Sequence, residues 1–149
     1  AVTTLGMIIG NQLNAYLIRR VEIHRRLFLG LAGSIASVAA LALLGSSGGA
    51  SLVTVTAALF VMMVFTGLVS PNATALALDG QPPKIAGSGS ALLGTLQFGI
   101  GSGLASTAGL TGPVTLSSMT AVMLATAVAA AVVFTAFAVR TRRTALATA

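Results

Sequence analysis

Residues 19–44 read RRVEIHRRLFLGLAGSIASVAALALL, four arginines within eight positions followed by eighteen uncharged residues. An arginine at the centre of a membrane-spanning helix costs about 2.5 to 3.5 kcal/mol, so the arginine-rich part does not belong in a hydrocarbon core. The apolar part approaches the roughly 20 helical residues that cross a bilayer. The stretch therefore predicts a polar loop over 19–26 followed by a transmembrane helix.

Four further apolar runs have the length of membrane spans, and short polar breaks separate them. The breaks are GSSGG at 45–49, DGQPPK at 79–84 and TGP at 111–113, all rich in residues that form turns. The fold class predicted is all-α, a multi-pass transmembrane helix bundle. The predicted spans are about 1–18, 27–45, 51–76, 86–110 and 114–139.

The distribution of basic residues predicts the orientation. All eight Lys and Arg residues fall in 19–26, at Lys84 and in 140–143, and successive crossings place these three patches on one side. By the positive-inside rule the loops 19–26 and 79–84 and the tail 140–149 are cytoplasmic. Residue 1 then starts outside, with no initiator Met, which predicts that the chain is the C-terminal piece of a longer transporter.

Composition excludes several classes of protein. Hydrophobic residues make up 56% and charged residues only 7%, which is incompatible with an ordinary soluble domain. The net charge of +6 comes from the flanks of spans, so the expected partner is the lipid bilayer and not nucleic acid. With no Cys, one His and two acids, there is no material for a catalytic triad, a carboxylate pair or a zinc site. We expect no enzyme activity, no cofactor and no metal.

The span 85–110 is rich in glycine, and Gly99-xxx-Gly103 has the spacing that lets helices approach closely in a bilayer. This helix is therefore expected to be packed inside a bundle. Gln97 is its strongly polar side chain, and two interpretations stay open, a hydrogen bond between helices or a place in a substrate cavity. Asn11 and Gln12 in the first span allow the same two interpretations. Asn14 is nearer the cytoplasmic end, which favours a structural role.

Pro71 and Asn72 predict a kink in the third span, because proline removes a backbone donor. Four soft or aromatic side chains precede that point, Phe60, Met62, Met63 and Phe65. They suit a core or lipid-facing surface, and they also suit a promiscuous hydrophobic pocket. The last span and 27–44 carry no strong polar group and are expected to be peripheral.

Three segments together resemble a known family. They are NAYLIRR at 14–20, SPNATALALD at 70–79 and AGSGSALLGTLQF at 86–98. Their order and spacing are similar to the end of helix 8, the end of helix 10 and the start of helix 11 of Bcr/CflA-type drug efflux transporters of the major facilitator superfamily. One departure is Glu22, where the family usually has glycine. It would shift the cytoplasmic turn or pair with Arg25 or Arg26.

The resemblance implies two six-helix bundles that rock about a central site in the bacterial inner membrane, driven by proton antiport. Small hydrophobic drugs such as chloramphenicol or bicyclomycin are the implied cargo, and the missing N-terminal half of the same transporter is the implied partner. The chain would supply helices 8 to 12, with 8, 10 and 11 facing the cavity. The acids Glu22 and Asp79 lie at the cytoplasmic surface, so the proton-coupling acid is expected in the missing half.

The residues expected to line the substrate cavity are Asn11, Met63, Gln97, Phe98 and Gly101. Those expected at the cytoplasmic gate and loops are Asn14, Arg19, Arg20 and Asp79. Two other functions stay open, a carrier for an uncharged metabolite and a free-standing small membrane protein that acts as a partner of another protein.

Overall fold

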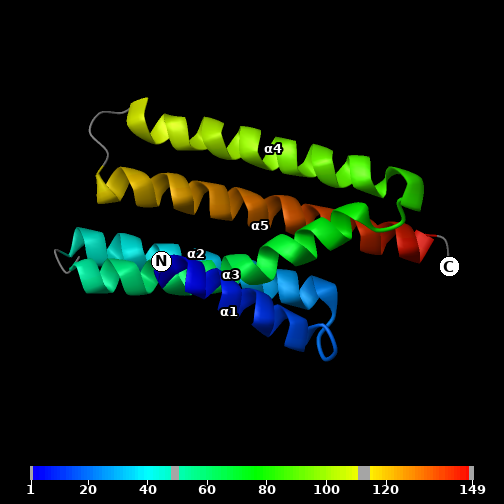
Figure 1. The fold of residues 1–149 in the computed structure, drawn as a ribbon, viewed down its shortest axis with the longest axis horizontal. Coiled ribbons are helices and arrows are strands. Elements are labelled where there is room, and N and C mark those ends of the chain that lie inside the picture. Colours follow the sequence, from blue (N-terminus) through cyan, green and yellow to red (C-terminus); the bar gives the residue numbers. More distant parts are fainter. Residues whose placement is uncertain (1, 48–50, 111–114, 148–149) are drawn as a thin grey trace.

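A computed structural model describes residues 2–47, 51–110 and 115–147, and in these ranges the chain forms helices and no strand. The predicted all-α fold is confirmed. Figure 1 shows long helices that run alternately in opposite directions and are joined by short connections. The helices are α1 (Val2–Leu17), α2 (Ile23–Ser46), α3 (Leu52–Leu78), α4 (Pro83–Leu110) and α5 (Leu116–Ala147).

The helix limits differ from the predicted loops at three places, one of which is the loop 79–84, because α4 begins at Pro83. The loop predicted over 19–26 is shorter, because α2 begins at Ile23 and its first turn includes Arg25 and Arg26. The helix of α5 continues to Ala147, through most of the predicted tail. A helix can extend past the hydrocarbon, so the limits of the spans themselves stay predictions.

The ends of the helices lie at two opposite ends of the bundle. The turn after α1, the turn between α3 and α4 and the C-terminal end of α5 all lie at the right-hand end of Figure 1, while the C-terminal ends of α2 and α4 lie at the left. The three basic stretches of the sequence therefore belong to one end of the molecule, which we call the basic end. This is the arrangement that the alternation of spans and loops predicted.

Within the described residues, three helices are long and apolar enough to cross a membrane: Ile23–Ser46, Leu52–Leu78 and Leu116–Val139 of α5. The described part of α1 has 16 residues, about 24 Å of helix, which is less than a hydrocarbon core of about 30 Å. The apolar content of α4 is diluted by glycine and hydroxyl side chains. These apolar helices indicate a membrane protein.

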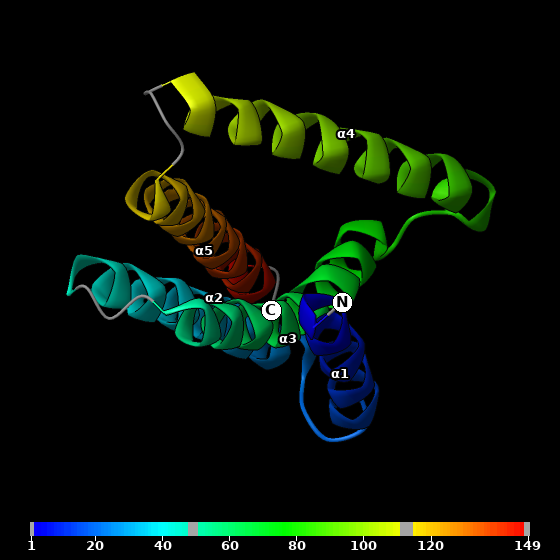
Figure 2. The ribbon, with the colours of Figure 1, turned by 60° about the vertical axis from the view of Figure 1, so that its left-hand side comes forward.

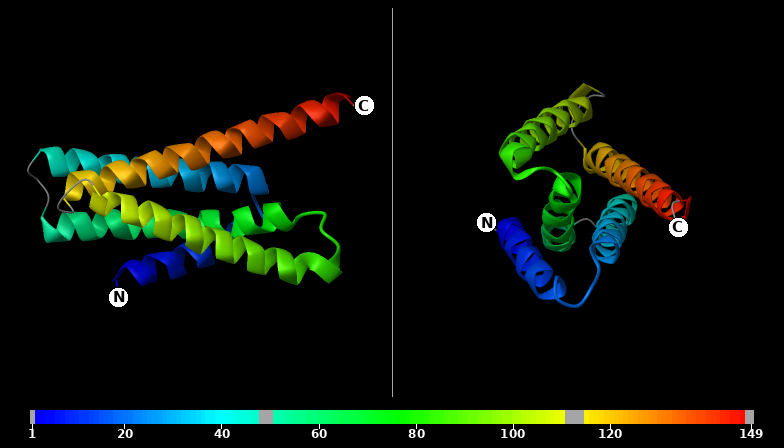
Figure 3. Two further views of the ribbon diagram at one scale, coloured as in Figure 1. Left: turned by 90° about the horizontal axis from the view of Figure 1, so that it is seen from above. Right: turned by 90° about the vertical axis from the view of Figure 1, so that its right-hand side faces the viewer.

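The third helix occupies the centre of the bundle. α1 and α2 both pack against α3, and α5 packs against α2, whereas α4 makes few contacts with α3 and α5. Seen end-on in Figure 3, α2 and α5 lie to one side of α3, and α1 and α4 flank its other side. Figure 2 shows α4 standing apart from the other helices.

The expectation that 27–44 is peripheral is wrong. The helix α2 contributes most of the buried apolar side chains, and Leu27, Val38 and Leu41 are 2%, 1% and 1% exposed. Gly30, Ser34 and Ser37 are buried on the same helix, and the two hydroxyls donate to the backbone oxygens of Gly30 and Gly33. Small residues with internally bonded hydroxyls let α2 approach α3 closely.

The closest helix contact joins α1 and α3 through glycines that the sequence analysis did not single out. A Cβ added at Gly6 would lie 2.7 Å from the backbone oxygen of Phe60, and one at Gly67 would lie 2.7 Å from that of Met7. A Cβ at Gly10 would collide with the backbone oxygen of Val64. Gly6-xxx-Gly10 is therefore the pair that brings two helix backbones together.

The prediction that the helix of 85–110 is packed inside the bundle is wrong for the described chain. A Cβ added at Gly99, Gly101 or Gly103 would meet no atom within 4 Å, and the residues around them are exposed. The spacing of Gly99 and Gly103 is right for a helix contact, but no described helix lies against that face.

Candidate functional site

Three polar side chains from three helices meet inside the basic end of the bundle. Asn14 comes from α1, Arg26 from the first turn of α2 and Asn72 from α3, and they are 5%, 7% and 2% exposed. Nη1 of Arg26 donates to Oδ1 of Asn72 at 2.6 Å and to Oδ1 of Asn14 at 3.3 Å. Nδ2 of Asn72 donates to Oδ1 of Asn14 at 2.6 Å. We call these three residues the polar cluster.

Two residues of the cluster also donate hydrogen bonds to backbone oxygens. Nε of Arg26 donates to the carbonyl oxygen of Val21 at 3.0 Å, and Nδ2 of Asn72 also donates to that of Leu68 at 2.6 Å. Among the described residues, no buried side-chain nitrogen or oxygen lacks a hydrogen-bond partner. The hydrogen bonds given for the guanidinium go to amide and peptide oxygens. Such a network ties three helices together and depends on each member.

The sequence favoured a structural role for Asn14 but did not predict the cluster. Arg26 was placed in the loop 19–26, and Asn72 was noted for the kink beside Pro71 and as part of the segment 70–79. The pairing of Glu22 with Arg26 considered above does not form, because the guanidinium of Arg26 points inward and binds Asn72 and the backbone of Val21. A signal was present in the sequence: Arg26, Gly30 and Ser34 follow at intervals of four, which puts them on one face of a helix. That face packs against α3.

Pro71 lies inside α3, next to the cluster. Figure 1 shows the C-terminal part of α3 running at an angle to its first part. Asn72 is buried while Pro71 is exposed, so the amide faces the other helices and the proline faces away from them.

Three of the expected gating residues, Arg19, Arg20 and Asp79, lie at the basic end and are exposed. Arg19 and Arg20 follow α1, and the guanidinium of Arg20 lies 5.2 Å from the ring centroid of Tyr16. Asp79 caps the C-terminus of α3 with extended backbone dihedrals. Asn14 is separated from them by its burial in the cluster.

The expected cavity residues do not meet within the described helices. Asn11 on α1 is exposed, Met63 on α3 is half-buried near Gly6, and Gln97 and Phe98 on α4 are exposed, Phe98 by 82%. α1 and α4 nevertheless lie on the side of α3 away from α2 and α5, as Figure 3 shows. The residues are thus distributed over one side and do not form a closed pocket.

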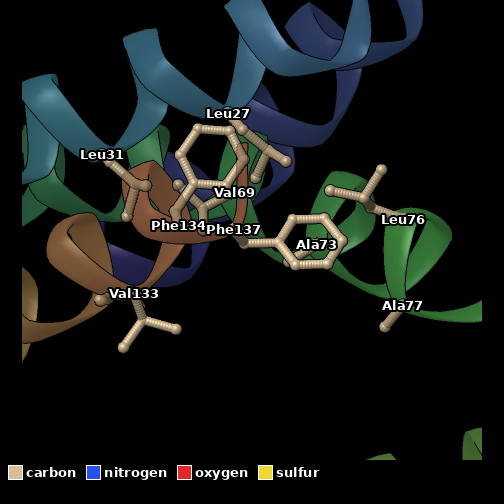
Figure 4. Close-up of a pocket in the computed structure, with 10 residues that line it drawn as sticks. Leu27, Leu31, Val69, Ala73, Leu76, Ala77, Val133, Phe134 and Phe137 are labelled. Carbon is tan, nitrogen blue, oxygen red and sulfur yellow. The ribbon is translucent and has the colours of Figure 1, made fainter. Parts of the chain in front are cut away.

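An open apolar pocket of about 410 Å³ lies on the other side, where α2, α3 and α5 meet. Figure 4 shows Leu27, Leu31, Val69 and Phe134 gathered along it, with Phe137 further out. The sequence analysis missed this space because it treated both α2 and the last span as lipid-facing surfaces. Its lining carries no charged side chain.

Comparison with protein families identifies the chain. The family model of the Major Facilitator Superfamily matches residues 1–106, which include α1 to α3, the polar cluster and most of α4. The chain belongs to this superfamily, and it is therefore a membrane transporter and not an enzyme. Comparisons with curated proteins and with solved structures gave no match. Among the described residues, no group of three His, Cys, Asp or Glu side chains is placed to hold a metal ion.

Proposed function

We propose that this chain is the C-terminal part of a proton-driven efflux transporter of the Bcr/CflA type, which exports small hydrophobic drugs across the bacterial inner membrane. The observation that carries the proposal is the meeting of Asn14 and Asn72. These residues belong to two of the segments that resemble the family, they are 58 positions apart, and they share a hydrogen bond of 2.6 Å. The segments thus act together as one structural unit at the basic end.

The chemistry of the exposed side favours uncharged cargo. Asn11, Met63, Gln97 and Phe98 offer amides, a thioether and a ring, and Gly101 leaves space beside them. Soft and aromatic side chains accommodate varied apolar molecules, while the two amides supply hydrogen bonds without charge. A carrier for a charged substrate would be expected to present a countercharge on this side.

The proton-coupling group is proposed to lie outside this chain, in the N-terminal half of the transporter. The two acids of the sequence, Glu22 and Asp79, are both exposed at the basic end. An acid that couples proton movement to transport is expected near the middle of the membrane, where its charge depends on the conformation of the protein.

The orientation is tested by labelling. The sequence contains no cysteine, so single cysteines at Ser47 and Gln81, both exposed in turns at opposite ends, report the two sides separately. An impermeant thiol reagent added to intact cells is expected to label Ser47→Cys, and Gln81→Cys only after the cells are opened. Labelling of both positions in intact cells would overturn the topology.

The function is tested by drug susceptibility in a pump-deficient host that carries the protein from its natural gene. Gln97→Ala is expected to change which drugs are exported, while Ala129→Leu, an exposed position on α5, leaves export unchanged. Gly101→Leu is expected to abolish export by filling the space beside Gln97. That loss would not come from packing among the described helices, because a Cβ added at Gly101 would meet no described atom of another helix within 4 Å.

Membrane levels of each variant must match. If Gln97→Ala leaves every susceptibility unchanged and Ala129→Leu alters them, the assignment of the transport side is wrong. If the wild-type protein protects against no drug but takes up a neutral metabolite, the carrier alternative replaces drug efflux.

A further inference from the structure

A second groove lies between α2 and α5 at the basic end, on the surface away from α1. It has a volume of about 670 Å³ and is lined by both polar and apolar side chains. The apolar lining includes Phe28 and Leu29 of α2 and Phe134 and Val139 of α5. Phe28, Leu29 and Val139 are exposed, so the apolar part of this groove is open to its surroundings.

The polar lining lies on the first turn of α2 and the residues just before it. His24 and Arg25 belong to it, and so does Glu22, the residue that precedes α2. The ring of His24 lies 6.2 Å from that of Phe134, which fixes the histidine against α5. Arg25 is exposed, and unlike Arg26 it is not part of the polar cluster.

The backbone of α5 continues as a helix beyond the groove. It carries the positions Arg140, Arg142 and Arg143 within about one turn of Val139. Arg25 of α2 carries a positive charge in the polar lining of the groove. One carboxylate, that of Glu22, opposes this positive charge.

We propose that this groove binds an anionic phospholipid, with its phosphate at Arg25 and its acyl chain along Phe28, Leu29 and Val139. Both helices are long and apolar enough to span a membrane, so the open apolar lining meets lipid and not water. Basic pockets between transmembrane helices at the cytoplasmic side suit anionic headgroups. The site is separate from the proposed drug path, which lies on the side of α1 and α4.

An amphipathic occupant fits better than a free phosphate. A soluble anion would use only the charged mouth and would leave the apolar lining, which makes up most of the groove surface, without a partner. A phospholipid uses both parts, and its headgroup lies at the level of the basic end when the helices cross the bilayer.

The test is native mass spectrometry of the protein expressed from its natural gene and purified in detergent, with phosphatidylglycerol and phosphatidylcholine added in equal amounts. The wild-type protein is expected to retain phosphatidylglycerol preferentially. Arg25→Gln should weaken that binding about fivefold, the effect of one basic side chain near an anionic surface. Glu22→Gln should strengthen it, because the opposing carboxylate is removed.

Lys84→Gln is the matched control, since it removes the same charge from an exposed position at the same end, on α4. It is expected to leave lipid binding unchanged. A loss equal to that of Arg25→Gln would overturn the proposal and show a diffuse charge effect. Equal retention of the two lipids, or release of lipid by glycerol phosphate at a similar concentration, would also overturn it. The opposite signs expected for Arg25→Gln and Glu22→Gln exclude misfolding as the cause.

Discussion

Glycines at a spacing of four residues occur both in the contact between α1 and α3 and on the open face of α4. They are tightly packed in the first region and have no packing partner in the second. Gly6 and Gly10 on α1 sit against the backbone of α3, so closely that neither position has room for a methyl group. Gly99 and Gly103 on α4 have the same spacing, but no described atom lies within 4 Å of a Cβ at either one. Small residues at intervals of four permit a close contact, and only the neighbouring helix decides whether one forms.

The polar side chains divide in the same way. Asn14 and Asn72 are buried and bonded to each other and to Arg26, whereas Asn11 and Gln97 are exposed on the side that α1 and α4 share. The buried amides hold the helices together. The exposed amides remain available for cargo, which is the role proposed for them.

The largest effect is expected from Gly10→Ala. Its added methyl group would collide with the backbone oxygen of Val64, and a backbone cannot give way as a flexible side chain does. We expect a loss of about 3 kcal/mol in stability, the upper end of the usual cost of overpacking. The measurement is the thermal stability of the purified protein and its level in the membrane. A Gly10→Ala protein as stable as the wild type would contradict the α1–α3 contact.

A smaller and coupled effect is expected in the polar cluster. Asn72→Leu removes the nearest acceptor of Arg26 and leaves a buried charge poorly compensated, which typically costs about 3 kcal/mol or less when other acceptors remain. Asn14 and the carbonyl of Val21 are those acceptors. The double variant Arg26→Met, Asn72→Leu removes the charge as well, so it should be more stable than Asn72→Leu alone.

A double-mutant cycle measures this coupling, with Arg25→Met as the control for loss of a neighbouring exposed arginine. Additive effects of Arg26→Met and Asn72→Leu would show that the hydrogen bond between them contributes nothing to stability.

The smallest effect, of the opposite sign, is expected from Gly103→Ala. Alanine stabilises a helix by about 1 kcal/mol relative to glycine. The new methyl group would meet no described atom within 4 Å. Stability should stay the same or rise slightly. A loss as large as that of Gly10→Ala would show that this face of α4 packs tightly against another part of the protein, and it would contradict the open transport side.

The sequence was sufficient to predict the helices and their alternating directions. The thickness of the bilayer sets the length of an apolar span, and the polar breaks mark where each span ends. It was also sufficient to place the basic residues at one end. The sequence did not predict how the helices pack. We expected α2 to be peripheral because it carries no strong polar group after Arg26. Its row of Gly30, Ser34 and Ser37 nevertheless faces α3. Which face of a helix is buried, and against which other helix, depends on the rotation of each helix about its axis. Hydropathy alone does not determine that rotation.

The polar cluster could not be predicted from charge patterning for a related reason. Four arginines in eight positions look alike in the sequence, and the positive-inside rule treats them as one patch. Only the packing of α1 and α3 against the start of α2 distinguishes Arg26, which is buried, from Arg19, Arg20 and Arg25, which are exposed.

We propose that the side shared by α1 and α4 lines a water-accessible transport path while the outer face of α5 meets lipid. Single cysteines at Gln97 and at Ala129, both exposed in the described chain, test it in the functional protein in native membranes. A small water-soluble thiol reagent is expected to modify Gln97→Cys, with protection by an exported drug, and to leave Ala129→Cys unmodified because lipid shields it. Modification of Ala129→Cys, with Gln97→Cys unreactive, would contradict the claim.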